Sequence, residues 1–471
     1  MRVAMRGRVL GISVAMAVTA ALVPVAPALG AAAAGGAKAK CPLGAIDKAG
    51  DKPVEVVFWH GTNRASEEAL QGLADQFNAS QSDVHVKLVN QTSYRDTIDK
   101  FRAGLSSGDL PDLVMIAETG LQQMIDSRSV LPAAACVKAD KFDMSDHVKR
   151  VTDYYTVEGT LWPMPFNVAG PILYYDKAAF RKAGLDPDKP PANLDEVRAA
   201  AQQLKDSGAV ENAGFGFKLD PWLFEQWIAI GGKTYVNNGN GRKVRATKAL
   251  FDDKIGQKVF TWLDGMVADG LAETNAYEGP GSTDNLLGIG THSHAMTIDS
   301  TSALGTIAQV LGQGDYADVE LGVAPMPAAV KGSGGVQVGG AALYIVNKST
   351  PAEQEGAWRF AKFLNEPEQV ATWSAATGYI PIVESAVDLP AVQQRWAELP
   401  GFKVAYDQLL TGPNNAATAG PVIGDYDGVR DAVKQGFEQL ISGGKSPKAS
   451  LKVAKQAADA AITDYNERIG A

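Results

Sequence analysis

The chain has 471 residues, of which 45% are hydrophobic and 21% are charged, a composition that excludes a disordered or fibrous protein. This length allows two lobes, each with its own hydrophobic core. The formal net charge of -9 argues against nucleic acid as a partner, because neutralising phosphates requires clustered Lys and Arg.

The first 34 residues have the pattern of a secretory signal peptide. Three arginines precede an apolar run from Val9 to Ala26, and small residues follow at Ala26-Pro27-Ala28, which suits cleavage by a signal peptidase. The run is only just long enough to span a bilayer, so an uncleaved anchor is the alternative. Removal of residues 1–34 would take away the three arginines and no acidic residue, which leaves the mature chain more acidic.

Cys41 and Cys136 are the two cysteines of the chain. In a secreted protein such a pair predicts a disulfide, which would close a loop of about 95 residues and stabilise the fold by about 4–5 kcal/mol in the chain-entropy model. Two free thiols are the alternative. Because Lys38 and Lys40 stand where a lipid-attachment motif has small, apolar residues, we expect no lipid anchor at Cys41.

The mature chain begins with three predicted strands that alternate with two helices. The strands are predicted at Val54–Trp59, Val84–Val89 and Asp112–Ile116, which are rich in β-branched and aromatic residues. Apolar residues recur at helical spacing in a segment that begins near Ser66 and in another that begins near Tyr94. This β-α-β-α-β order predicts an open α/β sheet with helices on both faces.

Similar alternation continues beyond Trp162, and the last quarter of the chain is mostly helical. Further strands are predicted at Pro171–Asp176, Ala295–Ile298 and Ala341–Val346. Further helices are predicted at 177–183, at 194–207, near 302–312, from Pro367 onward, and as a C-terminal pair joined at 443–447.

Polar side chains follow three of the predicted strands. His60 to Asn63 come after the first strand, Glu118 and Thr119 after the third, and residues 299–301 after the strand that contains Met296. The carboxyl ends of strands in open α/β sheets border the crevice where ligands bind. We therefore expect these three segments to converge on one site.

Two motifs that resemble enzyme signatures lack the required context. Gly104-Leu105-Ser106-Ser107-Gly108 has the letters of a nucleophile elbow, but Ser106 ends an amphipathic helix instead of occupying a strand-to-helix turn. Gly232-Lys233-Thr234 resembles the end of a P-loop, but Trp227 stands where that motif needs glycine. Neither motif indicates catalysis.

His292 and His294 would lie on one side of a strand, which is half of a possible zinc site. The chain has only five histidines, and no third ligand is evident. We therefore expect surface or loop histidines and no bound metal.

Four aromatic residues adjoin the ends of predicted elements: Trp59, Tyr94, Trp222 and Tyr379. A flat ring suits the apolar face of a sugar or glycerol unit, while nearby carboxylates and hydroxyls bond to its OH groups. Ordinary packing is the alternative for each ring alone. The presence of Glu118 near the same crevice favours a binding role.

Four stretches resemble the extracytoplasmic solute-binding proteins of carbohydrate-type ABC importers, and within them the binders of glycerol-3-phosphate and glycerophosphodiesters. The resemblance covers nearly the whole mature chain, from about Val54 onward. The four stretches are Phe58-Trp59-His60-Gly61, Pro165-Phe166-Asn167 with the strand Pro171–Lys177, Lys182-Ala183-Gly184-Leu185-Asp186-Pro187, and Thr377-Gly378-Tyr379-Ile380-Pro381-Ile382.

The resemblance implies an α/β fold of two lobes that close on a solute and deliver it to a membrane permease. It implies a binding protein rather than an enzyme, and we expect a monomer without a cofactor. From the strand crossings of the family, residues 54–169 and 298–344 form the first lobe, and residues 170–297 and 345–471 form the second.

The family motifs also imply which residues contact the solute. Glu118 would accept hydrogen bonds from the hydroxyls of the solute, and Trp222 and Tyr379 would supply stacking surface. Gly340 would let the backbone approach the solute closely. The implied ligand-binding residues are Tyr94, Glu118, Trp222, Ser300, Gly340 and Tyr379.

Two departures from the glycerol-phosphate binders bear on the ligand. Val168-Ala169-Gly170 replaces small hydroxyl residues, and the segment 416–423 holds no basic residue where those binders place an arginine for the phosphate. A desolvated phosphate without a cation is costly. Lys218 or a helix N-terminus near Ser302 could substitute, but a neutral sugar, short oligosaccharide or glycerol conjugate is favoured.

A secreted hydrolase acting on glycans or phosphoesters is the alternative function. A paired-carboxylate mechanism needs two acids that face each other across the cleft. Glu118 and Asp299 are the pair that the sequence offers.

Overall fold

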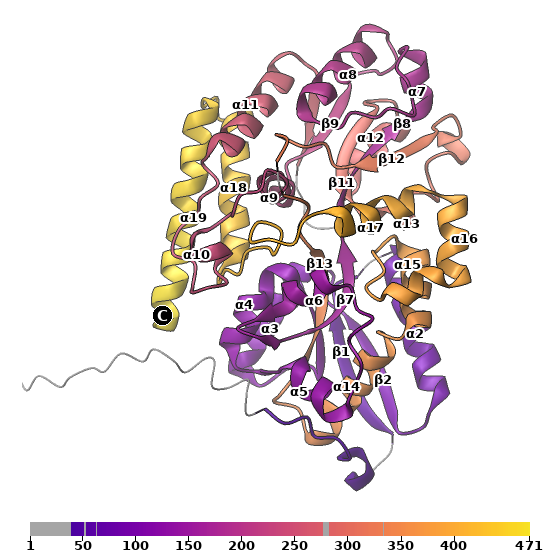
Figure 1. The fold of residues 1–471 in the computed structure, drawn as a ribbon, viewed down its shortest axis with the longest axis vertical. Coiled ribbons are helices and arrows are strands. Elements are labelled where there is room, and N and C mark those ends of the chain that lie inside the picture. Colours follow the sequence, from indigo (N-terminus) through magenta and orange to yellow (C-terminus); the bar gives the residue numbers. More distant parts are fainter. Residues whose placement is uncertain (1–38, 51–52, 63, 277–281, 333) are drawn as a thin grey trace, which may run out of the picture.

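A computed structural model describes residues 39–50, 53–62, 64–276, 282–332 and 334–471. The predicted signal peptide at 1–34 lies outside the described residues. Within the described ranges, no helix is long and apolar enough to cross a membrane. The chain forms two α/β lobes, one above the other in Figure 1, each built around its own sheet.

The first lobe is built on a sheet with the strand order β2-β1-β3-β13-β4, in which β7 also pairs with β13. β1 runs parallel to both of its neighbours, whereas β13 runs antiparallel to all of its own. The strands are β1 (Val54–His60), β2 (Val84–Asn90), β3 (Leu113–Ala117), β4 (Val130–Leu131), β7 (Met164–Ala169) and β13 (Gly339–Val346).

The second lobe contains a sheet with the order β10-β9-β11-β8-β12. β9 is parallel to β10 and β11, whereas β8 is antiparallel to β11 and β12. Its strands are β8 (Pro171–Asp176), β9 (Phe215–Lys218), β10 (Ala272–Asn275), β11 (Met296–Ser300) and β12 (Leu321–Pro325), and a separate small hairpin pairs β5 (Thr156–Val157) with β6 (Thr160–Leu161).

The longer helices cover both sheets, and their ends follow local sequence signals. Ser93 caps the N-terminus of α3 by accepting from the Asp96 N–H, and Gly108 ends the helix in the left-handed conformation. Ser106 therefore lies in the last turn of a helix. These helices are α2 (Arg64–Ser80), α3 (Tyr94–Ser107), α8 (Leu194–Asp206), α9 (Pro221–Ile230), α11 (Lys254–Ala268), α14 (Pro351–Phe363), α15 (Pro367–Thr377), α18 (Tyr426–Ile441) and α19 (Pro447–Ile469).

Shorter helices complete both lobes. The helix predicted near 302–312 is confined to α13 (Leu304–Ile307), which follows a 3-10 turn at Thr301–Ala303. The other short elements are η1 (Ile46–Lys48), α4 (Leu121–Ser127), α5 (Ala133–Asp140), α6 (Lys149–Tyr155), α7 (Lys177–Lys182), α10 (Asn237–Asn240), α12 (Asp284–Gly290), α16 (Pro390–Glu398), α17 (Gly401–Thr411) and the 3-10 turns Glu118–Gly120 (η2), Gly314–Tyr316 (η4) and Glu384–Asp388 (η5).

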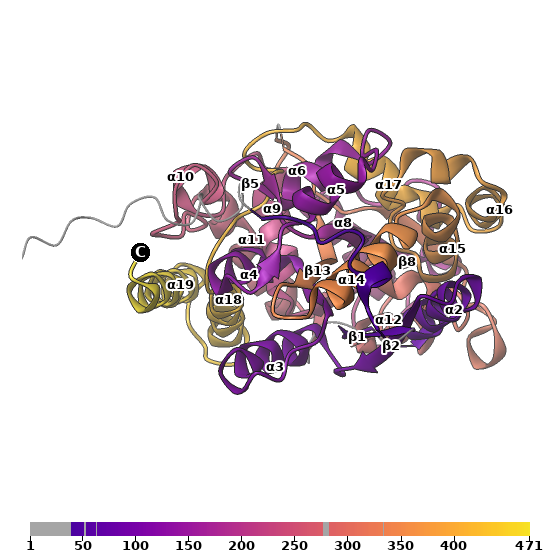
Figure 2. The same cartoon turned by 90° about the horizontal axis from the view of Figure 1, so that it is seen from below.

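The chain passes between the lobes at three places. It crosses from β7 to β8 at Gly170, returns between β12 and β13, and leaves the first lobe again after α15, since α17 packs on β12. Late in the chain, α18 and α19 lie side by side on the flank of the second lobe, next to α3 of the first (Figure 2).

The division between the lobes differs from the expected one at residues 298 and 344. β12 and the end of β11 fall in the segment assigned to the first lobe, but both strands pair with β8 in the second sheet. α14 and α15 fall in the segment assigned to the second lobe, but they pack on β1 and α2 of the first. Strand pairing decides the first assignment and helix packing the second, and the motifs report neither.

A disulfide joins Cys41 to Cys136 and fixes the N-terminal segment to α5. The same segment contains η1, where the Ile46 N–H donates to Glu355 Oε2 at 3.0 Å. Glu355 lies on α14 and is buried. The segment before β1 is thus attached to the first lobe at two points.

Candidate functional site

One cavity lies between the two lobes, at the carboxyl ends of strands from both sheets. It is lined by the segments that follow β1, β3, β9 and β11, as expected for an open α/β sheet. Trp59 does not line it, whereas the six residues that the family motifs imply as ligand-binding all do: Tyr94, Glu118, Trp222, Ser300, Gly340 and Tyr379. We call this space the cleft cavity.

A pair of tyrosine hydroxyls forms part of the first-lobe wall. Tyr94 OH and Tyr379 OH lie 2.9 Å apart, and Asn167 Nδ2 donates to Tyr94 OH at 2.6 Å. Burial raises the pKa of both tyrosines, so both phenols are protonated at neutral pH. This wall can both donate hydrogen bonds to a solute and accept them.

Tyr379 belongs to the first lobe rather than to the second, where the sequence had placed it. Its ring stacks on Trp373 of α15, with centroids 5.5 Å apart and planes inclined by 16°. Gly378 ends α15 with φ 89°, which directs the tyrosine back towards the cavity. The ring therefore packs in the core while its hydroxyl reaches the cleft cavity.

Gly340 has a structural reason to be glycine in addition to its place in the cavity wall. Its φ is 97°, and an added Cβ would lie 1.9 Å from the carbonyl oxygen of Asn167 on β7. The register between β13 and β7 shifts at the adjacent Ala341 and Ala342. Glycine is therefore required at this position because β7 passes close to it. The expected reason was a close approach of the solute to the backbone.

A cluster of ion pairs next to the cleft cavity joins the two lobes. Arg430 of α18 donates from Nη2 to Glu118 Oε1 at 2.7 Å and binds both oxygens of Glu225 at 2.8 Å. Glu118 follows β3 in the first lobe, whereas Glu225 lies on α9 in the second. Burial raises the pKa of Glu118 and raises that of Glu225 to about 6, and Arg430 opposes both shifts.

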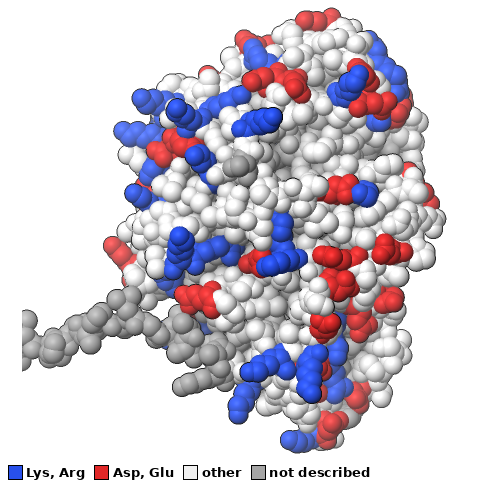
Figure 3. Space-filling model, in the orientation of Figure 1, with Lys and Arg blue, Asp and Glu red and all other residues white. Residues whose placement is uncertain are grey.

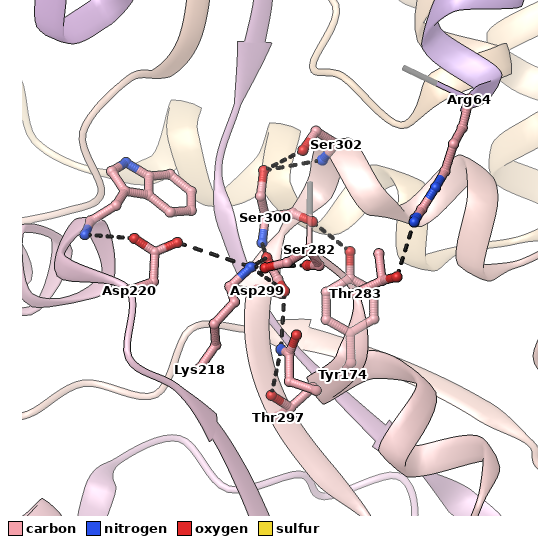
Figure 4. Close-up of polar contacts among 12 residues, drawn as sticks. Arg64, Tyr174, Lys218, Asp220, Ser282, Thr283, Thr297, Asp299, Ser300 and Ser302 are labelled. Carbon is pink, nitrogen blue, oxygen red and sulfur yellow. Dashed lines mark hydrogen bonds and ion pairs between the residues drawn. The ribbon is translucent and has the colours of Figure 1, made fainter. Parts of the chain in front are cut away.

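The second-lobe wall contains a buried lysine held by carboxylates (Figure 4). Lys218 Nζ lies 2.9 and 2.7 Å from the two oxygens of Asp299 and 4.0 Å from Asp220 Oδ2. The other oxygen of Asp220 accepts from the Trp222 N–H at 2.9 Å and so caps α9. Burial raises the pKa of Asp220, against the opposing effect of Lys218.

Asp299 and Ser300 are fixed by further contacts. Asn285 Nδ2 donates to Asp299 Oδ2 at 3.0 Å, and the Ser302 hydroxyl donates to Ser300 Oγ at 2.9 Å. The hydroxyl of Tyr174 donates to the Ser300 carbonyl at 2.7 Å. These bonds hold the end of β11 in place; the contacts of Ser300 with Ser302 and Tyr174 can be followed in Figure 4.

Lys218 was considered from the sequence as a substitute cation for a phosphate. It does line the cleft cavity, but its charge is matched by Asp299 at hydrogen-bond distance and by Asp220 farther away. A phosphate would have to compete with two buried carboxylates for this ammonium group.

Arg430 is the cavity residue that sequence reasoning missed. The family's arginine position lies before Gly424, whereas Arg430 follows Gly424 within an amphipathic helix. An arginine on a helix is usually solvent-exposed. No local pattern indicated that α18 lies against the cleft.

Arg64 is the remaining cation that lines the cleft cavity among the described residues. It begins α2 in the first lobe, and its Nη1 donates to the hydroxyl of Thr283 in the second lobe at 3.1 Å. Figure 4 shows its side chain extending from the helix to Thr283. The residue is exposed, so solvent screens its charge more than those of Lys218 and Arg430.

The alternatives raised by the sequence can be compared with this geometry. Glu118 and Asp299, the carboxylate pair of the hydrolase alternative, both line the cleft cavity, but each is held in an ion pair.

His294 is buried, with its ring nitrogens facing Glu273 and the carbonyl of Asn285. His294 is thus a buried residue of the loop before β11. In the described ranges, no three His, Cys, Asp or Glu residues are grouped to hold a metal ion.

Residues 72–401 match the family of bacterial extracellular solute-binding proteins. Because this range is more than half of the chain, the chain belongs to that family. This result confirms the resemblance drawn from the sequence motifs.

Two curated relatives illustrate the similarity. The sn-glycerol-3-phosphate-binding periplasmic protein UgpB of Yersinia pseudotuberculosis is 28% identical over 421 residues, covering 88% of this chain and 93% of the relative. UgpB of Escherichia coli strain 536 is 29% identical over 409 residues, covering 85% of this chain and 90% of the relative.

Solved structures share the fold. The GacH receptor of Streptomyces glaucescens, solved unliganded and with acarbose, has a TM-score of 0.72 at 21% identity and covers 87% of this chain and 99% of its own. UgpB of Mycobacterium tuberculosis in complex with glycerophosphocholine has a TM-score of 0.71 at 21% identity and covers 87% and 98%. These likenesses confirm the two-lobed α/β fold.

Proposed function

We propose that the protein is the extracytoplasmic solute-binding component of an ABC importer. It captures a carbohydrate or a glycerol-derived solute between its lobes and delivers the solute to a permease. The observation that carries the proposal is the cleft cavity, where aromatic and hydrogen-bonding residues of both lobes face one space. Its relatives include binders of glycerol-3-phosphate, and membership of the solute-binding family supports the same function.

The cavity residues have distinct roles in this proposal. Trp222 offers a ring face for the apolar side of a sugar or glycerol unit. Glu118 accepts from hydroxyl groups, and the phenols of Tyr94 and Tyr379 donate or accept. Ser300 and the backbone at Gly340 complete the contacts.

The location and assembly of the protein are part of the same proposal. Residues 1–34 direct secretion and are removed, no lipid is attached at Cys41, and the mature protein works as a monomer without nucleic acid. Acidic and basic side chains are interspersed on the face shown in Figure 3. A mixed surface of this kind lacks the clustered positive charge that nucleic acid requires.

A thermal-shift screen tests the proposal. A solute present at about 100 times its dissociation constant should stabilise the protein by about 2.7 kcal/mol. The screen should contain neutral sugars, glycerol-3-phosphate and glycerophosphodiesters, and each positive solute should be recovered unchanged after incubation. Chemical conversion of the bound solute, abolished in Glu118→Gln, would instead support a hydrolase.

A further inference from the structure

The buried charges in the cleft cavity are matched before any solute enters. Among the described residues, three cations and three acids line it: Arg64, Lys218 and Arg430 with Glu118, Asp220 and Asp299. Lys218 is paired with Asp299, and Arg430 is paired with Glu118 and with Glu225 behind it. The buried part of the cavity therefore offers no uncompensated positive charge to an anion.

One carboxylate oxygen in the second-lobe wall of the cavity is open as an acceptor. Asp220 Oδ1 caps α9, but no described group donates a hydrogen bond to Oδ2, whose nearest cation is Lys218 at 4.0 Å. The side chain of Asp220 is only 10% exposed. A buried carboxylate oxygen without a donor is costly, so a bound solute that donates to it gains that free energy.

A second acceptor lies on the opposite lobe. Glu118 is 6% exposed, and its Oε1 accepts from Arg430, whereas no described side chain donates to Oε2. Asp220 and Glu118 thus present carboxylate oxygens from the two lobes to the same cavity. Trp222, two residues after Asp220, also lines the cavity.

We propose that the solute is an unphosphorylated saccharide whose ring stacks on Trp222 and whose hydroxyls donate to Asp220 and Glu118. This inference rests on the proposed function and narrows it to one class of solute. Asp220 and Glu118 select for hydrogen-bond donors, and together they disfavour a phosphate group through like-charge repulsion. Because the two carboxylates come from different lobes, one saccharide that reaches both also holds the lobes together.

Isothermal titration of the purified protein tests this proposal. The probes are maltose, trehalose and cellobiose as neutral sugars, and glycerol-3-phosphate and glycerophosphocholine as phosphate-bearing solutes. We expect at least one sugar to bind and both phosphate compounds to bind at least about tenfold more weakly, which corresponds to about 1.4 kcal/mol.

Three variants identify the contacts. Asp220→Asn keeps the Oδ1 cap of α9 and should weaken sugar binding by about 10- to 100-fold, since it removes a charge-assisted hydrogen bond. Glu118→Gln should have a similar effect. Asp315→Asn, the same change at an exposed position, should leave affinity unchanged. Circular dichroism melts establish that each variant is folded.

The outcomes separate this inference from the broader function. If glycerol-3-phosphate or glycerophosphocholine binds more tightly than every sugar, the solute-binding function stands and the saccharide inference is wrong. Unchanged sugar affinity in both Asp220→Asn and Glu118→Gln would also overturn it. If no probe binds at all, the inference and the proposed function both fail.

Discussion

At the scale of single residues, Trp222 is the side chain whose removal should reduce solute binding most directly. Trp222→Ala should weaken sugar binding by at least about tenfold, because aromatic stacking and the buried apolar area are both lost. Titration calorimetry measures the change. Trp396→Phe on α16, outside the residues that line the cleft cavity, is the control and should bind like the wild type. Equal affinities for Trp222→Ala and the wild type would exclude a stacking role.

Glu225 should give the protein a measurable pH dependence. Its pKa in the folded protein is about 6, raised by burial from an ordinary value of 4.5. The folded state therefore binds this proton more tightly than the unfolded state, so the contribution is fully present below pH 4.5. It is lost as the pH rises through 6, at a cost of about 2 kcal/mol.

Urea unfolding at several pH values between 4 and 7 tests this dependence. The difference in free energy of unfolding between wild type and Glu225→Gln should change by about 2 kcal/mol across this range, because the variant lacks the titrating group. A constant difference would show that Glu225 does not titrate in this range.

At the scale of elements, the close pairing of β13 with β7 predicts that a side chain at position 340 will destabilise the fold. Gly340→Ala places a Cβ 1.9 Å from the Asn167 carbonyl at a φ of 97°. Gly444→Ala has a positive φ of 63° but open space around the added atom. Both variants should lose about 1 kcal/mol or more from backbone strain. Gly340→Ala should lose several kcal/mol further, measured as a lower midpoint in denaturant.

The disulfide provides a second test at this scale. Cys41→Ser with Cys136→Ser should lower the free energy of unfolding by about 4–5 kcal/mol, because the unfolded chain regains the entropy of a large loop. The bond joins the N-terminal segment to α5 and contributes nothing to the cavity lining, so sugar affinity should be unchanged at a temperature where the variant is folded. Unchanged stability would mean that the contacts of η1 alone fix the segment.

Several elements could be predicted from the sequence because their signals are local. The strand predicted at Val84–Val89 is β2 at Val84–Asn90, and the helix predicted at 194–207 is α8, capped by the side chain of Asn193. The cluster of Lys218 with Asp299 could not be predicted, since 81 positions separate the two residues. Pairing between distant segments has no local pattern, and this same limit displaced the lobe boundaries.

At the scale of the whole molecule, contacts between lobes beyond the cavity should control closure. Arg245 of the second lobe forms an ion pair with Asp126 of α4, whose Oδ2 also accepts from Tyr465 of α19 at 3.0 Å. These bonds stabilise the arrangement in which the lobes meet. A solute that binds between the lobes favours the same arrangement, so a contact that stabilises this arrangement also strengthens solute binding.

Arg245→Met should therefore favour separated lobes and weaken solute binding without touching the solute. We expect a larger radius of gyration by small-angle X-ray scattering in the absence of solute, and an affinity reduced by about threefold or more. Arg181→Met breaks the exposed ion pair with Glu320 inside one lobe and should change neither quantity. Identical scattering for Arg245→Met and wild type would show that this ion pair does not influence closure.

The position of β13 in the first sheet also determines the order in which the molecule can fold. This strand comes from residues 339–346, yet it lies between β3 and β4 and also pairs with β7. Strands from the first 170 residues cannot complete their sheet until a segment almost 170 residues later joins them. Closing such long loops slows folding. A fragment that ends before residue 339 should accordingly expose unpaired strand edges and aggregate, whereas the full chain refolds late and cooperatively.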